Sequence, residues 1–271
     1  GMIMGNVALF NRHFDPFNLL LDTESRTLFV LNPKVMTSFT RRMLRDGLKR
    51  FRSEGDPSRG RYPWLGNARQ FPLHSMGTYM RLALGQGGLS VFSIVRNPYI
   101  RTFSAWRDKF YDPHIAGRGR ASAYPRSMRN GELRKFRRFA DRNGLEGGRD
   151  GTLVPFSTFL AKIESQPDGH RNHHWDSQLK VIQSQHFVFE RCFRMEDEKT
   201  TCFQTVFGRM GFDPRWISDR LGQPANPSST TRVPLISEND LTRIASLFRA
   251  DFNAFGYALT PPASLEKYMI G

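Results

Sequence analysis

The feature that most constrains the fold of this chain is a strand, a turn and a helix in succession, which occur twice. Residues 27–33 form a short apolar run that ends at a turn residue, as a buried parallel strand does, and helical apolar spacing follows. Residues 90–95 form a second such run, and a helix is predicted over residues 98–110, with Pro98 near its first turn. Strands that alternate with helices predict an α/β protein with right-handed crossovers.

This alternation predicts a three-layer α/β fold in which a central parallel sheet is flanked by helices. Because 271 residues can bury one substantial core, we expect a single domain over residues 1–271. Ligands of such folds bind beyond the carboxyl ends of the strands. The side chains of Lys34 and Arg96, which follow the two strands, are therefore expected at the mouth of the sheet.

Periodicity in the rest of the chain predicts further helices, a short strand and two loops. Helices are expected at about residues 132–142, 156–165 and 196–209, and a strand at residues 187–189. Segments 54–72 and 112–131 are rich in Gly, Pro and Arg and are predicted to be loops. A last helix is predicted over about residues 241–255, and Ser237 with Asp240 before it resembles a capping box.

The chain is strongly basic, because forty Lys and Arg residues against twenty-five Asp and Glu give a formal net charge of +15. Such an excess favours anionic partners, namely nucleotides, sulfated or carboxylated glycans, nucleic acid or acidic membranes. Residues 118–142 alone hold nine Arg or Lys and two acids. Three interpretations of this stretch remain open: a solvated helix face with a loop, an acceptor groove for an anionic glycan, and a nucleic-acid-binding surface.

Two other classes of protein fit the sequence less well. A basic nucleic-acid-binding protein would carry a helix-turn-helix, zinc-finger or RNA-recognition signature, and none occurs here, so we expect no nucleic-acid partner. A nucleotide kinase would carry a Walker loop, Gly-x-x-x-x-Gly-Lys-Ser/Thr, which the chain also lacks.

Cysteine usage and hydropathy bear on the compartment of the protein. Cys192 and Cys202 are too few for a disulfide framework, and a single bridge between them is neither required nor excluded. No stretch approaches the ~20 apolar residues of a membrane span. The N-terminus shows no charged segment followed by an apolar run, so we expect no transmembrane segment, no signal peptide and a cytoplasmic protein.

The first strand leads into a segment with the chemistry of an anion site, here called the lysine turn (residues 33–39). It brings a lysine and two hydroxyls to a strand-to-helix junction, where backbone N–H groups and the helix dipole also favour an anion. Its residues are Pro33, Lys34, Val35, Met36, Thr37, Ser38 and Phe39. Taken alone, the pattern is more often an ordinary helix cap.

The second strand leads into the arginine segment (residues 95–104), in which Arg96 ends the strand and Ser104 lies two helical turns further on. A guanidinium fork suits a terminal phosphate, and a serine hydroxyl adds a donor. A surface arginine and an ordinary helix serine explain the segment as well when it is considered alone.

In order, spacing and context, the two segments together resemble the sulfotransferases that use 3′-phosphoadenosine-5′-phosphosulfate (PAPS), specifically the carbohydrate sulfotransferase family 2 type. In that family a Pro-Lys-x-x-x-Thr/Ser loop binds the 5′-phosphosulfate, and an Arg with a Ser eight residues later binds the 3′-phosphate. The resemblance implies a P-loop-NTPase-like fold. It also implies transfer of a sulfuryl group from PAPS to a hydroxyl of a carbohydrate or glycoconjugate acceptor, anionic or neutral, with release of the bisphosphate PAP. The implied PAPS-binding residues are Pro33, Lys34, Thr37, Ser38, Phe39, Arg96 and Ser104.

Further segments resemble the same family, so that the resemblance spans about residues 27–257. They are Arg-Asn-Pro-Tyr-Ile-Arg-Thr-Phe-Ser-Ala-Trp-Arg-Asp-Lys-Phe (96–110), His-Trp-Asp-Ser-Gln (174–178) and Asp-Phe-Asn-Ala-Phe-Gly-Tyr (251–257). An Asn/Ser-rich loop before the last helix implies nucleotide contacts from Ser229 and Arg232, although a solvated linker fits it equally well. Met36 replaces the usual Gly or Ala of the lysine turn and is expected to reshape the sulfate pocket, while Asn97 replaces a common Asp.

Sulfuryl transfer requires a group that takes the proton of the acceptor hydroxyl. His74 resembles the catalytic base of the heparan 2-O-sulfotransferase branch in its position between the two segments, and His174 is its main rival. Lys34 has a second potential role, because its ammonium can stabilise the charge that develops on the departing nucleotide phosphate. His170, His173 and His174 lack a suitably spaced Cys or acidic ligand, so we expect no metal.

Overall fold

The computed structural model of the protein describes seven stretches of the chain. They are residues 11–15, 18–22, 25–53, 88–111, 126–146, 154–222 and 236–270. The chain divides into two compact units, each assembled from two separate segments. Unit 1 comprises residues 1–96 and 178–228, and unit 2 comprises residues 97–177 and 229–271. A single domain over the whole chain stays a prediction.

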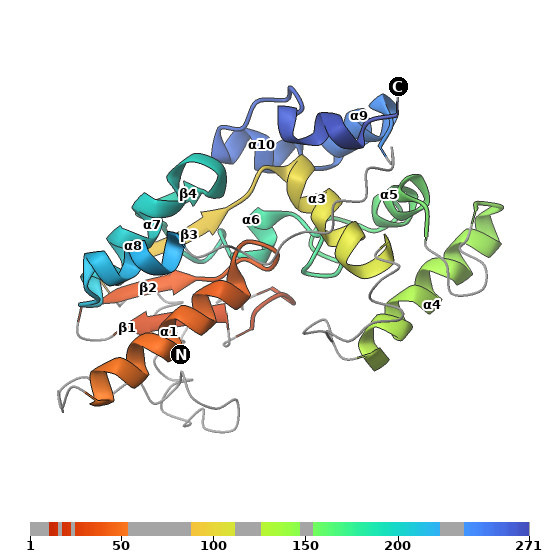
Figure 1. Ribbon diagram of the computed structural model, residues 1–271. Coiled ribbons are helices and arrows are strands. Elements are labelled where there is room, and N and C mark those ends of the chain that lie inside the picture. The colour runs from red at the N-terminus through yellow and green to blue at the C-terminus, as the bar shows by residue number, and fades with distance from the viewer. Residues whose placement is uncertain are drawn as a thin grey trace, which may run out of the picture. The chain divides into compact units, whose positions relative to one another are not determined.

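Unit 1 contains a four-stranded mixed sheet with the strand order β1-β2-β3-β4 (Figure 1). Its strands are β1 (Leu19–Asp22), β2 (Thr27–Val30), β3 (Ser90–Val95) and β4 (Arg191–Arg194). β3 pairs in parallel with both of its neighbours, whereas β1 pairs antiparallel with β2. The connection from Asp22 to Thr27 is too short for the crossover that a parallel pair needs. The predicted α/β class is confirmed, and the sheet is mixed rather than parallel throughout.

Unit 1 also contains helices. In the described chain they are α1 (Thr37–Ser53), α6 (Gln178–Val181), α7 (Met195–Arg209) and α8 (Pro214–Gly222). Of these, α1 and α7 pack through buried aromatic rings. The Phe29 ring of β2 lies edge-on to Phe203 and Phe207 of α7, with ring centroids 6.5 and 6.2 Å apart. Phe39 of α1 lies 5.6 Å from Phe203 in the same manner. α1 and α7 therefore cover the same face of β2.

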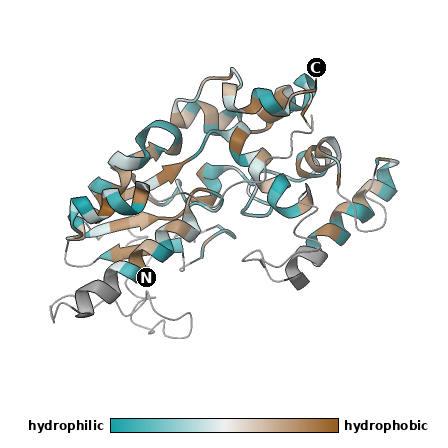
Figure 2. Cartoon of the chain, viewed as in Figure 1, coloured by the Kyte–Doolittle hydropathy of each residue, from teal (hydrophilic) through white to brown (hydrophobic). Residues whose placement is uncertain are grey.

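Amphipathic periodicity positions α1 as the sequence predicts. Met43 and Leu44 are buried in the core of unit 1, whereas Arg42 and Arg45 are exposed. Figure 2 shows the same pattern, with mostly hydrophobic strands and with both hydrophobic and hydrophilic residues along α1. The helix predicted at residues 196–209 is confirmed as α7.

Unit 2 is helical in its described parts. Its elements are α3 (Pro98–Trp106), which continues into the π-helical turn η3 (Arg107–Tyr111), α4 (Arg126–Asn143), α5 (Phe156–Glu164), α9 (Glu238–Leu247), α10 (Arg249–Phe255) and the short 3₁₀ helix η4 (Ala263–Tyr268). The centre of its core is aromatic, because the rings of Phe110, Phe136, Phe159 and Trp175 contact one another with centroids 4.6–6.0 Å apart. The helices predicted at 98–110, 132–142 and 156–165 are confirmed as α3 with η3, α4 and α5.

The strand predicted at residues 187–189 is wrong. This segment is irregular, and its Val188 side chain is 90% exposed rather than packed on the face of a sheet. The strand lies instead at β4, whose sequence Arg-Cys-Phe-Arg exposes Arg191 at the edge of the sheet. A strand with one partner and an exposed polar side does not show the continuous apolar run that was used to find β2 and β3.

Other predicted boundaries also differ. α4 begins at Arg126, so the end of the predicted loop 112–131 is helical. The last helix is split at Phe248 into α9 and α10, although the capping box of Ser237 with Asp240 is present as predicted. The predicted loop at residues 54–72 lies outside the described residues.

Cys192 in β4 and Cys202 in α7 are free thiols, so the bridge that the sequence left open does not form. Burial raises the pKa of Cys192 to about 12 and also raises the pKa of Cys202. Both side chains are therefore protonated and unreactive at neutral pH. Within the described stretches, no helix has the length and apolar character needed to cross a membrane.

Candidate functional site

The lysine turn joins the carboxyl end of β2 to the amino end of α1. The Val35 side chain is fully buried in the core of unit 1 and anchors the turn there. Lys34 and Met36, on either side of it, are half-buried. The turn closes on one carbonyl, that of Asn32, which accepts hydrogen bonds from the Val35 N–H at 3.0 Å and from the Thr37 hydroxyl at 2.9 Å. The strand-to-helix connection predicted from the sequence is therefore present as a tight, anchored turn.

The backbone of this turn is unusual at two positions. Lys34 has φ of 68° and Met36 has φ of 55°, both in the left-handed region that favours glycine. Because a side chain in this region costs about 1–2 kcal/mol, the turn is strained. A Gly two residues after the lysine, as occurs in the resembled family, thus has a physical reason here, since Met36 adopts a glycine-like conformation. An Ala at that position does not share this reason.

The amino end of α1 offers donors to an anion. The first N–H groups of a helix have no acceptor within the helix, and the helix dipole places partial positive charge there. The first turn of α1 holds no acidic residue, and Ser38 in that turn is exposed. Phe39 directs its ring into the core against Phe203, so its backbone rather than its side chain is available to a ligand.

Arg96 follows β3 directly and lies beside the lysine turn. Its guanidinium donates a long hydrogen bond of 3.4 Å to the carbonyl of Lys34. β2 and β3 are parallel neighbours, so both residues lie at the carboxyl edge of the sheet. The structure thus brings together Lys34 and Arg96, the two cations that the sequence placed at the mouth of the sheet.

Gln178, the first residue of α6, connects the ends of these two strands. Its side-chain oxygen accepts from Asn32 Nδ2 at 2.8 Å and from the Arg96 N–H at 2.9 Å. Its side-chain nitrogen donates to the Arg96 carbonyl at 2.8 Å. Gln178 and Asn32 are fully buried. The sequence assigned neither residue a role. Gln178 does end the segment 174–178 that resembles the family, and this resemblance was the one signal that could have indicated it.

Ser104 and His174 belong to unit 2. Ser104 is half-buried on α3, which is capped by Asn97: the Asn97 side chain accepts from the Tyr99 N–H at 3.0 Å. Asparagine caps a helix about as well as aspartate, so the Asn97 departure preserves this local structure. The Tyr99 hydroxyl donates to the Leu259 carbonyl at 2.6 Å, and burial raises its pKa.

His174 lies half-buried in a loop, with its ring centroid 4.2 Å from that of His173 and 6.5 Å from that of Trp175. The His174 N–H donates to Asn172 Oδ1 at 3.0 Å. In the parts of the chain that the structure describes, no group of three or more His, Cys, Asp or Glu side chains could hold a metal ion.

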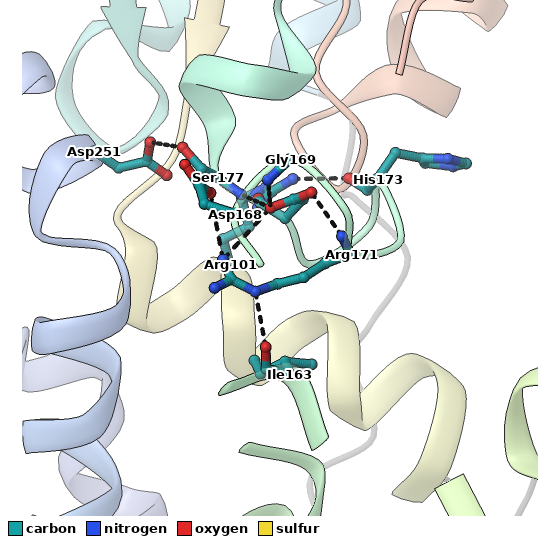
Figure 3. Close-up of polar contacts among 9 residues, drawn as sticks. Arg101, Ile163, Asp168, Gly169, Arg171, His173, Ser177 and Asp251 are labelled. Carbon is teal, nitrogen blue, oxygen red and sulfur yellow. Dashed lines mark hydrogen bonds and ion pairs between the residues drawn. The ribbon is translucent and has the colours of Figure 1, made fainter. Parts of the chain in front are cut away.

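A buried polar network fixes the loop that carries His174 (Figure 3). Arg101 donates to the carbonyls of Asp176 and His173 at 2.6 and 3.0 Å. The Asp176 carboxylate accepts from the N–H groups of Gly169, Arg171 and Ser177 at 2.9–3.1 Å. The Ser177 hydroxyl donates to Asp251 at 2.7 Å. Three of the segments quoted for the resemblance, 96–110, 174–178 and 251–257, are thus linked in unit 2.

Three of the predicted site residues, His74, Ser229 and Arg232, lie outside the described residues. The other predicted residues are placed within one unit or the other: Pro33, Lys34, Thr37, Ser38, Phe39 and Arg96 in unit 1, and Ser104 and His174 in unit 2.

The fold and the site define an α/β protein in which the lysine turn and the arginine segment follow two parallel strands. This arrangement is suited to an anionic ligand. A model of the sulfotransferase family matches residues 19–258, which is most of the chain. The chain therefore belongs to the sulfotransferase family, and its resemblance to the family 2 type is confirmed. No curated protein and no solved structure matches it.

Proposed function

We propose that the protein transfers a sulfuryl group from PAPS to a hydroxyl of a carbohydrate. The observation that carries the proposal is the family match over residues 19–258, joined to the proximity of Lys34 and Arg96 beyond two parallel strands. The same arrangement supports a P-loop-NTPase-like, three-layer architecture. The family match favours this function over a nucleic-acid-binding protein or a nucleotide kinase.

The proposed donor site divides the nucleotide between two segments. The lysine turn binds the 5′-phosphosulfate through the Lys34 ammonium, the Ser38 hydroxyl and the backbone N–H groups of the first helical turn. Thr37 is assigned to the same site, where its hydroxyl must exchange the Asn32 carbonyl for the ligand. Arg96 binds the 3′-phosphate through its guanidinium fork, with the Ser104 hydroxyl as a further donor. Additional contacts are assigned to Pro33, Phe39, Ser229 and Arg232.

The proposed reaction is an in-line displacement at sulfur. The acceptor oxygen forms a bond to sulfur while the bond from sulfur to the bridging phosphate oxygen breaks, so PAP leaves with that electron pair. Lys34 stabilises the negative charge that develops on the leaving phosphate. The proton of the acceptor hydroxyl passes to a base, for which His74 is the first candidate and His174 the second.

The proposed acceptor is an anionic glycan or glycoconjugate. α4 supports this class of acceptor because Arg134, Lys135, Arg138 and Arg142 are exposed on it, and Asp141 is an exposed acid beside them. Long-range attraction from such a helix would raise the encounter rate with a polyanion at low salt. A cytoplasmic site of action belongs to the same proposal.

Two assays test this function. Incubation with PAPS that carries radiolabelled sulfur should transfer label to a hydroxyl of a glycan in a panel, and no transfer to any carbohydrate would overturn the proposed acceptor class. PAP should bind the protein and resist competition by ATP. At PAP concentrations about 100-fold above Kd, mass action should add about 2.7 kcal/mol to the free energy of unfolding.

Arg96→Ala should keep the apo protein folded but raise the Kd for PAP by roughly 10–100-fold, because a charge-assisted hydrogen bond contributes about 1.5–3 kcal/mol. Isothermal titration and the PAP-dependent shift in melting temperature measure this loss. Arg215→Ala, which removes an exposed arginine from α8, is the matched control and should bind PAP as the wild type does. An unchanged Kd in Arg96→Ala would remove Arg96 from the 3′-phosphate role.

A further inference from the structure

β2 leads into the lysine turn and β3 leads into the arginine segment. Where these two segments begin, β2 and β3 are no longer paired with each other. The β2–β3 ladder ends with Val30 opposite Ser93, two residues before Asn32 and three before Arg96. Beyond that rung, the backbone ladder does not set the separation of the two strand ends. Some other contact must do so if one ligand is to bridge both turns.

The Gln178 side chain provides such a contact between the two strand ends. It pairs with both backbone groups of Arg96, accepting from its N–H at 2.9 Å and donating to its carbonyl at 2.8 Å. A primary amide bonded in this way imitates one rung of a β-ladder. Its oxygen also accepts from Asn32 Nδ2 at 2.8 Å, which connects the β3 end to the β2 end.

The orientations of both amides follow from this arrangement. The Arg96 N–H is only a donor and the Arg96 carbonyl only an acceptor, so the Gln178 oxygen must face the first and the nitrogen the second. The Asn32 amide must then present its nitrogen to Gln178. Asn32 in turn supplies the carbonyl on which the lysine turn closes, through Val35 and Thr37.

We propose that Gln178 is a positioning residue that fixes the separation of the lysine turn and Arg96, and thereby the affinity for a nucleotide with phosphates at both its 5′ and 3′ ends. The inference rests on the proposed function. Gln178 touches no ligand in this role, because it is fully buried and bonded to backbone and to Asn32. It acts by holding the two strand ends at one distance, which reduces the cost of adjusting that distance when the ligand binds.

Gln183 provides a matched control in the same unit. It is also a buried glutamine, and its amide also makes a two-sided pair: its oxygen accepts from the Asn11 N–H at 3.0 Å, and its nitrogen donates to Asn11 Oδ1 at 2.7 Å. Neither Asn11 nor Gln183 belongs to the two turns. Removal of this amide should therefore cost stability as removal of Gln178 does, without any effect on the separation of the turns.

The experiment compares Gln178→Met with Gln183→Met, since methionine keeps nearly the length of glutamine and removes its hydrogen bonds. Both variants should melt below the wild type. Only Gln178→Met should lose affinity for PAP, by about tenfold or more in titration of the folded protein. Sulfate alone, which occupies one turn, should lose much less affinity than PAP, because one anion does not need both turns at a fixed distance.

A second variant keeps the inference testable if Gln178→Met does not fold. Gln178→Glu retains the oxygen acceptors for the Arg96 N–H and Asn32, and its protonated form regains a donor for the Arg96 carbonyl. The Kd of this variant for PAP, divided by that of the wild type at the same pH, should fall from pH 8 to pH 6. A ratio near one at both pH values, or equal losses of PAP and sulfate affinity, would overturn the positioning role.

The outcome for the wild type separates the two hypotheses. If the wild type binds PAP and Gln178→Met binds it within twofold of the wild type, the positioning role is wrong and the proposed function stands. If the wild type does not bind PAP, the proposed function fails and the positioning role, which depends on it, fails as well.

Discussion

At the scale of single residues, the backbone conformation of Met36 leads to a prediction opposite to the usual effect of glycine on stability. Met36→Ala and Met36→Gly both lose the contacts that the half-buried side chain makes beyond Cβ with the core of unit 1. Glycine normally costs about 0.5–1 kcal/mol relative to alanine. Here φ is 55°, so Met36→Gly should be more stable than Met36→Ala by about 1 kcal/mol, as measured by urea denaturation.

The control for this prediction is Arg42, an exposed residue in the regular part of α1. There Arg42→Gly should be less stable than Arg42→Ala by about 1 kcal/mol. If alanine were the more stable residue at both positions, the turn would not hold Met36 in the left-handed region in solution, and the strain attributed to it would be absent.

Residue chemistry explains which parts of the site were predictable. Lys34 and Arg96 each follow a buried apolar run directly, so local sequence places them at strand ends. The contact of Gln178 with Asn32 joins residues 146 positions apart, and its contact with Arg96 joins residues 82 positions apart. No local pattern encodes such a pair, and the quoted element at 174–178 marked Gln178 without indicating what it bonds.

At the scale of elements, the start of α7 carries a pH-dependent contribution to stability. The Arg194 N–H donates to the Glu198 carboxylate at 2.8 Å, and this hydrogen bond is the main reason that the pKa of Glu198 is lowered. Burial opposes the shift, and the Arg191 guanidinium, which also bonds Glu198, adds to it. A carboxylate whose folded pKa is depressed stabilises the protein above its unfolded pKa of about 4.3, and that contribution is lost as the pH falls through the folded pKa.

Glu198→Gln should therefore melt below the wild type at pH 7, and the gap should close as the pH is lowered from about 5 to about 3. Thermal unfolding of both proteins across this range, followed by circular dichroism, measures the gap. A gap that stays constant down to pH 3 would show that the ionised form of Glu198 does not contribute to the stability of α7.

Elements were predictable where one face or one run is strongly apolar. β2, β3 and α1 met this condition. β2 and β3 lie within the predicted runs 27–33 and 90–95, and α1 follows the first of them as predicted. β1 was not predicted, because its four residues Leu19–Asp22 form too short an apolar run to be recognised as a strand. β4 was misplaced to the apolar segment 187–189, because the exposed Arg191 and the half-buried Arg194 flank its short core-facing part.

At the scale of the whole molecule, the chain returns to each unit after leaving it. Unit 1 is built from residues 1–96 and 178–228, with residues 97–177 of unit 2 between them. The chain crosses between the units three times. The sequence shows no linker at the first two crossings, because Arg96 and Ser177 fall inside segments that resemble the family, whereas the third, after Ser228, falls in the Asn/Ser-rich loop that a linker fits equally well. A division of this kind depends on contacts between distant segments and therefore does not appear in local composition.

The complete reaction adds one requirement that neither basic turn meets, namely a base for the acceptor hydroxyl. If His74 is that base, His74→Ala should keep the affinity for PAP near that of the wild type and lower turnover by roughly 10²–10⁴-fold, the usual contribution of general base catalysis.

His174→Ala should instead weaken acceptor binding or the packing of its loop against Trp175 more than the chemical step. Titration with PAP and turnover at saturating acceptor, measured on both variants, distinguish these effects. Full turnover in His74→Ala, together with an inactive His174→Ala that still binds PAP, would assign the base to His174; activity in both variants would transfer the role to a carboxylate or to solvent.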